Sequence, residues 1–140
     1  MHCSFKKESI VDKQIKKLYI AETVLGGNLK GKAKKYSTSY ITKFIHRIVG
    51  RRVKVVFPKD GDAYYRRNTI GIPVSWACSK PVALHEIAHY YTGPTHGPVF
   101  ALVLLFLVGL FLGSKQQGRL IRSYLRHRVS FLPSIKRLGR

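Results

Sequence analysis

Acidic residues are scarce in this chain. Of its 140 residues, 26 are Lys or Arg and only 6 are Asp or Glu, so the formal net charge is +20. No carboxylate side chain follows Glu86. This surplus does not decide the fold, but it predicts attraction to polyanions, with nucleic acid first and an anionic membrane surface second. The alternative is a basic surface that only keeps the protein in solution.

Cysteine is also rare. Cys3 and Cys78 form no CxxC pair and no disulfide framework, so nothing indicates an oxidising compartment. The opening residues, MHCSFKKESIVDK, have no apolar stretch after their charges, and we therefore predict no secretory signal. The cytoplasm is the expected location.

No apolar run is long enough to cross a bilayer. The longest, Val99 to Leu112, lacks polar side chains but falls short of the roughly 20 residues that a span requires. Such a run is more typical of a helix in a protein core, with Pro98 in its first turn and Gly113 at its exit. The basic flank at Lys115 and Arg119 keeps a membrane contact open as the alternative, although we expect no membrane partner.

The hydrophobic pattern predicts an α+β fold. Residues 1–25 have a weak helical period, and 37–50 have a strong one. Alternation over 53–57 predicts a strand, and 63–74 predicts two more, broken near Asn68. With helices following, we expect a small antiparallel sheet packed on helices.

The length predicts a single domain over 1–140. We expect its core at about 37–112, between a basic N-terminal segment, 1–36, and a basic C-terminal helix, 114–140. Apolar residues of that helix lie on one side and arginines on the rest. It is interpreted as docked with a solvated face, or alternatively as a contact for nucleic acid or anionic lipid.

A metal-binding pattern follows the strands. His85 to His89 reads HEIAH, an HExxH motif. On a helix, positions i and i+4 share one face, so both imidazoles can reach one ion. Glu86 is suited to accept a proton from a metal-bound water. Pro81 before the motif and Gly93 after it agree with a helix.

A catalytic zinc ion normally has three protein ligands and a place for water. Because no acid follows Glu86, the downstream candidates for the third ligand are His96 and His127. His127 lies in a run of arginines typical of a surface, whereas a turn after Gly93 can return His96 to the motif helix. The Met-turn of metzincins is excluded, since the only methionine is Met1.

His85–His89 followed by His96–Phe100, HGPVF, resembles the SprT/Spartan-like metallopeptidases, in which a histidine in an HGxxF context follows the HExxH helix. The stretch Tyr64–Pro73 is also similar to one in short HExxH metallohydrolases. The resemblance covers about 50–112. It implies a zincin-like fold with HExxH on an active-site helix. It also implies one Zn²⁺ bound by His85, His89 and His96, with Glu86 as general base.

These observations predict a zinc-dependent metallohydrolase, most readily a peptidase acting on a protein or peptide. The strand with Ile70 and Ile72 is expected to be the edge along which an extended substrate lies. Tyr90, Tyr91 or an arginine is expected to stabilise the oxyanion. By the resemblance and the charge, the substrate is a protein on nucleic acid, and the basic surface binds DNA.

Two other functions stay open. A non-catalytic, basic nucleic-acid-binding protein could hold a structural zinc ion, and a fourth ligand such as Cys78 would favour it because closed coordination leaves no place for water. A membrane-bound metalloprotease anchored by Val99–Leu112 is the third possibility.

Overall fold

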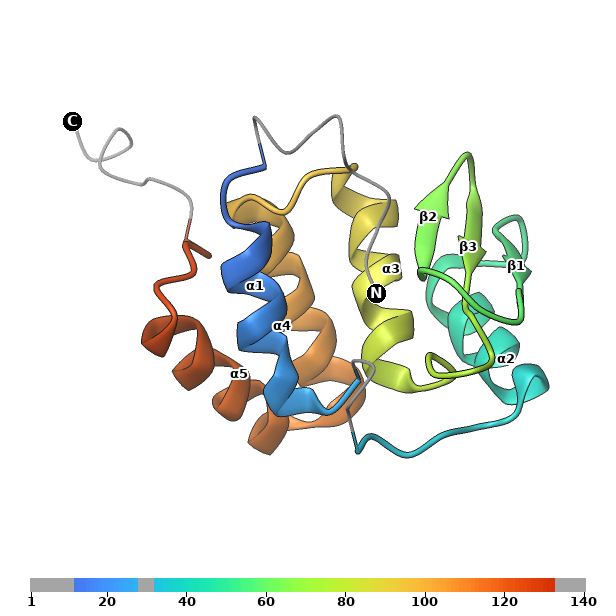
Figure 1. Cartoon of the computed structure of the whole chain (residues 1–140), viewed down its shortest axis with the longest axis horizontal. Helices are drawn as coiled ribbons and strands as arrows, with labels where there is room; N and C mark the ends of the chain where they lie inside the picture. Colours follow the sequence, from blue (N-terminus) through green and yellow to red (C-terminus); the bar gives the residue numbers. More distant parts are fainter. Residues whose placement is uncertain (1–11, 28–31, 133–140) are drawn as a thin grey trace.

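Five α-helices, one 3₁₀ helix and three strands make up the part of the chain that the computed structural model describes, residues 12–27 and 32–132 (Figure 1). In order they are α1 Ile15–Glu22, η2 Thr23–Leu25, α2 Thr38–Val49, β1 Lys54–Val56, β2 Tyr64–Arg66, β3 Thr69–Gly71, α3 Lys80–Thr92, α4 Pro98–Leu112 and α5 Ser114–Arg126. The α+β class is therefore confirmed. The outer parts of the two predicted basic end segments, 1–11 and 133–140, lie outside the described residues.

Proline and glycine mark the ends of the central helices as predicted. Ser37 caps α2, where its hydroxyl accepts a hydrogen bond from the backbone N–H of Tyr40 at 3.1 Å. Helix α3 has a proline in its first turn and ends at Gly93, whose φ of 100° favours glycine. The apolar run likewise forms one helix, α4, which ends at Gly113.

The sheet is mixed, so the prediction of an antiparallel sheet is wrong for one of its two pairings. The strand order is β1-β3-β2. A two-residue turn at Arg67 and Asn68, both with positive φ, joins β2 to β3 as an antiparallel hairpin. Strand β3 inserts between β1 and β2, and it runs parallel to β1.

The predicted edge strand is also wrong. Strand β3, which contains Ile70, lies in the centre of the sheet, and both Ile70 and Ile72 are buried. A central strand has hydrogen-bonding partners on both sides and cannot accept another chain. Strand β2 is instead the edge strand that contacts α3.

Helix α3 occupies the middle of the molecule. It lies between the sheet with α2 on one side and the helices α1, α4 and α5 on the other (Figure 1). All residues from Val82 to His89 are buried. Any polar side chain in this part of α3 is therefore removed from bulk water and requires a partner.

The core extends beyond the predicted limits of 37–112. Leu18 of α1 and Leu120 and Tyr124 of α5 are fully buried members of the same core cluster. The Tyr124 hydroxyl donates a hydrogen bond to the Ala101 carbonyl of α4 at 2.9 Å. Helices α1 and α5 are thus structural parts of the domain and hold α4 from behind.

Candidate metal centre

Three histidine side chains meet beside α3. The Nε2 atom of His96 lies 3.0 Å from Nε2 of His89 and 3.3 Å from Nε2 of His85. One potential ligand atom from each residue lies within 4.8 Å of the others, and all three residues are buried. This group could hold a metal ion.

Two elements bring the rings together. His85 and His89 are one helical turn apart on α3. The chain then leaves the helix at Gly93, turns, and enters α4 at Pro98, so that His96 returns over α3 at the start of the second helix. The predicted position of His96 beside the motif histidines is confirmed by this geometry.

The Nδ1 atom of each ring is anchored by an acceptor. His89 Nδ1 donates to the Gly93 carbonyl at 2.8 Å. His96 Nδ1 and its backbone N–H both bond to Asp12, at 2.7 and 3.0 Å. His85 Nδ1 lies 2.8 and 3.1 Å from the two carboxylate oxygens of Glu22. With the proton on Nδ1, each neutral ring directs the lone pair of Nε2 at the common centre, which is how histidine binds a metal ion.

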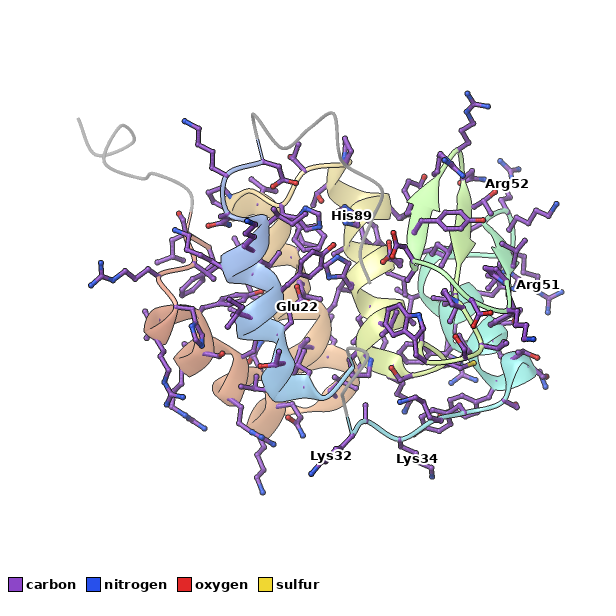
Figure 2. All side chains as sticks on the ribbon, viewed as in Figure 1. Glu22, Lys32, Lys34, Arg51, Arg52 and His89 are labelled. Carbon is purple, nitrogen blue, oxygen red and sulfur yellow. The ribbon has the colours of Figure 1, made fainter. Side chains whose placement is uncertain are left out.

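Sequence reasoning missed Asp12 and Glu22 as partners of the histidines. Asp12 precedes α1 and Glu22 is its last residue, and α1 lies in front of α4 in the view of Figure 1. Figure 2 shows Glu22 on α1 and His89 on α3. A signal was present: of the six acidic residues in the chain, three, Glu8, Asp12 and Glu22, lie in a weakly helical, otherwise basic N-terminal segment. The burial of Asp12 and Glu22, rather than their spacing, identifies their role.

Aromatic side chains enclose the three rings. Phe100 is 1% exposed, and its ring centroid lies 4.5 to 4.9 Å from all three imidazole centroids. Tyr19 of α1 stacks on His85 at 5.5 Å and 20°. The phenylalanine of the HGPVF sequence thus forms a wall of the site, because its ring packs against all three imidazoles. These contacts keep the rings in place.

Burial keeps the rings neutral. It lowers the pKa of His85 to about 3 and that of His96 to about 4. The pKa of His89 falls to about 2, first through burial and then through the charges of the other two rings. Burial also raises the pKa of Glu22 to about 8, against the opposing charge of His96. A neutral imidazole is the form that binds a metal ion.

Two of the six acidic residues contact the rings, Asp12 at His96 and Glu22 at His85. Asp12 is 3% exposed, and the Glu22 side chain is 14% exposed. Two carboxylates in one buried place repel one another and lose solvation, whereas a divalent cation between them balances their charge. The donor set therefore fits a bound cation.

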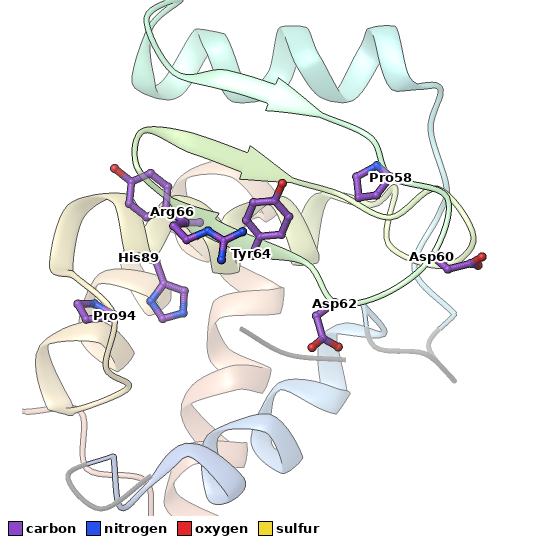
Figure 3. A pocket seen from close by; sticks show the side chains of 8 residues that line it. Pro58, Asp60, Asp62, Tyr64, Arg66, His89 and Pro94 are labelled. Carbon is purple, nitrogen blue, oxygen red and sulfur yellow. The ribbon is translucent and has the colours of Figure 1, made fainter. Parts of the chain in front are cut away.

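A pocket of about 430 Å³ opens between β2 and α3 and reaches His89 (Figure 3). Tyr64, Tyr65 and Arg66 of β2 lie on one side, and Pro94 lies beyond His89 on the other. The loop after β1 completes it with Pro58, Asp60 and Asp62. The pocket thus reaches one of the three histidines from the side of the edge strand.

Contacts within the sheet hold the pocket in shape. The Trp76 indole N–H donates to the carbonyl of Gly61 at 2.8 Å, which ties down the loop that carries Asp60 and Asp62. The ring of Tyr64 lies over Gly71 on β3, its partner across the hairpin, and a Cβ atom at Gly71 would collide with that ring. Glycine at this position therefore lets Tyr64 lie flat beside the pocket.

The other predicted site residues have different positions. Glu86 is buried on α3, directly after His85. Tyr90 packs edge-to-face on Tyr65, a pocket residue, at 5.9 Å. Tyr91 instead lines a groove with residues of α2 and α4, and its hydroxyl donates to the Ile48 carbonyl at 3.4 Å. The structure therefore does not bring Tyr91 into the pocket beside His89.

Neither remaining alternative ligand joins the histidines. Among the residues that the structure describes, the group that could hold a metal ion comprises His85, His89 and His96, without Cys78 or His127. Burial raises the pKa of the Cys78 thiol, which disfavours the thiolate that a metal would require. A site closed by Cys78 is therefore not formed.

Comparison with known proteins adds no relative. No family model matches the chain, and no curated protein or solved structure matches it significantly. The zincin-like fold and the membership of the SprT/Spartan-like group therefore stay predictions. The class that the fold and the site define is an α+β protein with a candidate three-histidine metal centre.

Proposed function

We propose that this protein is a zinc-dependent hydrolase that cleaves peptide bonds. The observation that carries the proposal is the convergence of one potential ligand atom from each of three histidines within 4.8 Å, two of them on a helix that carries the HExxH motif. Three imidazoles with one position left for solvent are typical of catalytic zinc, whereas structural zinc sites have four protein ligands.

The ligand set favours zinc. His85, His89 and His96 would supply three nitrogen ligands, while Asp12, Glu22 and the Gly93 carbonyl orient the rings. When bound in such a site, Zn²⁺ acts as a Lewis acid that lowers the pKa of a coordinated water and polarises a carbonyl group.

In this proposal the residues of the chain divide the remaining work. Glu86 accepts the proton of the attacking water and later passes it to the amine that leaves. Burial of Glu86, which is 2% exposed, limits the access of bulk water to this transfer. Arg66 and Tyr64 replace Tyr91 as the groups that stabilise the oxyanion, because both line the pocket at His89.

The substrate is a peptide in extended conformation. Strand β2 lines the pocket and lies at the edge of the sheet, so its backbone can pair with one more strand. A chain bound in this way passes the opening toward His89. In the cytoplasm, the compartment that the sequence predicts, a net charge of +20 favours substrates that are associated with nucleic acid.

The proposal is tested by Glu86→Gln. We expect the purified protein to contain about one zinc ion per chain and to cleave an unstructured protein such as casein. The variant should retain the metal and the circular dichroism spectrum of the wild type, but its hydrolysis rate should be about 10²- to 10⁴-fold lower. His127→Gln, a change at a half-buried residue outside both the pocket and the histidine group, is the control for general disturbance. Unchanged hydrolysis by Glu86→Gln would reject the mechanism.

A second candidate function is nucleic-acid binding without catalysis. Three arginines of α5, Arg119, Arg122 and Arg126, line a hollow of about 200 Å³ together with Ser123. Arg51 and Arg52 project on another side, next to β1 (Figure 2). If this function is right, duplex DNA binds at low salt, binding falls steeply as salt rises, and Arg122→Ala with Arg126→Ala weakens it. Zinc without hydrolysis would then favour this function.

A further inference from the structure

Helix α4 exposes apolar side chains on the side away from the core. Its inner face is buried, with Leu104 and Val108 fully inaccessible. On the outer face, Val99 is 56% exposed, Phe106 58% and Leu110 75%. These three residues recur at about two-turn and one-turn spacing and form one stripe along the helix. The interpretation of this segment as a core helix is thus confirmed for one face only.

A groove continues this stripe toward α2 and α3. It has a volume of about 450 Å³. Its walls are formed by Arg47, Ile48, Tyr91, Val103, Phe106, Leu107, Leu110 and Phe111. The groove is apolar apart from the guanidinium of Arg47 and the hydroxyl of Tyr91, so it suits an apolar chain that carries a negative charge at one end.

The charges around this surface have one sign. Helices α2, α4 and α5 contain no Asp or Glu, whereas α2 carries Lys43 and Arg47 and α5 carries four further basic residues. Lys43 and Arg47 are exposed and one helical turn apart. Lys115, also exposed, follows closely after the end of α4. A large apolar stripe flanked by cations is complementary to lipid with an anionic headgroup.

We propose that the outer face of α4 docks on an anionic lipid bilayer. Phe106 and Leu110 enter the boundary between headgroups and acyl chains, the groove receives part of an acyl chain, and Arg47 contacts a lipid phosphate. The helix lies in the plane of the surface: no helix in the described part of the chain is long and apolar enough to cross a membrane. A second copy of the protein fits less well, because two molecules of net charge +20 repel each other.

The metal pocket stays open in this orientation. Tyr91 lines the groove and His89 lines the pocket. On an α-helix, residues two positions apart are rotated by about 200° and therefore point to nearly opposite sides. Docking through α4 therefore turns the candidate metal centre and β2 away from the bilayer. The inference does not rest on the proposed hydrolase activity.

The test is co-sedimentation of the full chain with vesicles at physiological salt. We expect binding to vesicles with about 30% phosphatidylserine in phosphatidylcholine and weak binding to phosphatidylcholine alone. Phe106→Asp with Leu110→Asp should weaken binding at least about tenfold. The matched control, Ile20→Asp with Val74→Asp, makes the same charge change at two exposed apolar residues on other elements and should stay within about twofold of the wild type.

A second measurement does not require that the double variant folds. Leu110→Trp should show fluorescence that brominated lipids quench, and Ile20→Trp should not. Equal loss of binding in both double variants would mean attraction by net charge alone and would overturn the proposal. It would also fall if Leu110→Trp were not quenched. A dimer that forms without lipid and is abolished by Phe106→Asp would show instead that a second copy covers this face.

Discussion

The helices α3 and α4 lie side by side and depart from the usual distribution of polarity in opposite ways. Helix α3 buries polar groups, namely His85, Glu86 and His89, at 2% to 5% exposure. Helix α4, which has no polar side chain, leaves Phe106 and Leu110 more than half exposed. Buried polar groups and exposed apolar stripes are the two departures that most often mark function.

The difference shows what each helix requires from its surroundings. The histidines of α3 are held by hydrogen bonds to specific atoms of Asp12, Glu22 and Gly93, so small changes of geometry matter. The outer face of α4 has no such directional contacts. We expect substitutions on α3 and its partners to change metal binding. On α4, we expect substitutions on the inner face to lower stability and those on the outer face to leave it nearly unchanged.

Removal of a histidine should have the largest effect. His96→Ala leaves two ligands and should reduce the metal content from about one ion per chain to near zero after dialysis against a weak chelator. Hydrolysis should disappear with the metal. Elemental analysis measures the first effect and a casein assay the second. His127→Ala, at a half-buried histidine outside the group, should behave as the wild type. Full metal content in His96→Ala would disprove the assignment of His96 as the third ligand.

The two faces of α4 can be compared with one chemical change. Leu104→Ala removes a fully buried side chain and should lower the free energy of unfolding by about 2–5 kcal/mol. Leu110→Ala, six residues later and 75% exposed, should change it by less than about 0.5 kcal/mol. Urea unfolding monitored by circular dichroism distinguishes the two. A large loss from Leu110→Ala would show that another part of the protein covers this face.

Loss of an anchoring carboxylate should weaken metal binding without abolishing it. Asp12→Asn removes the charge that orients and polarises His96, and changes of this kind reduce metal affinity about 10- to 100-fold. Competition with a chromophoric chelator measures the affinity. Asp60→Asn removes an exposed carboxylate that makes no hydrogen bond to the three histidines, and the metal affinity of this control should be close to that of the wild type. Equal affinity in Asp12→Asn and the wild type would argue that Asp12 only supports the fold.

The metal-free protein should be most stable near neutral pH. Below the ordinary histidine pKa of 6.5, the three histidines are protonated in the unfolded protein but stay neutral in the folded protein. The free energy of unfolding therefore falls as pH decreases. Glu22 acts oppositely: its folded pKa of about 8 exceeds its ordinary 4.5, so stability falls as pH rises toward 8. Thermal unfolding in chelator should give a maximum between these limits, and a steady rise from pH 5 to 9 would contradict it.

Local signals predicted the elements well. The start of a helix near Ser37, the helix end at Gly93, the break between strands near Asn68 and the proline at the start of α4 all lie where the sequence predicted them. Each depends on the conformational preference of one or two residues, which acts without the rest of the chain. The mixed sheet was missed because the partner of a strand is chosen by packing and not by its own pattern.

Only the part of the candidate site that is formed by residues close together in the sequence was predictable. The spacing of His85 and His89 follows from the helical period, and the absence of later acids pointed to His96. Asp12 and Glu22 could not be assigned, since they lie 84 and 63 residues from the histidines that they contact. Contacts of that range depend on where α1 is placed relative to α3 and to the turn that carries His96.

The amino-acid sequence by itself determined the helix with two histidines on one face, its ends, and a surface with excess positive charge, because these follow from covalent spacing and composition. Only the tertiary structure decided which acids orient the rings, which strand borders the pocket, and which side of α4 remains exposed. Those features depend on the placement of segments that are distant in the chain, and that placement comes from burial of the shared core.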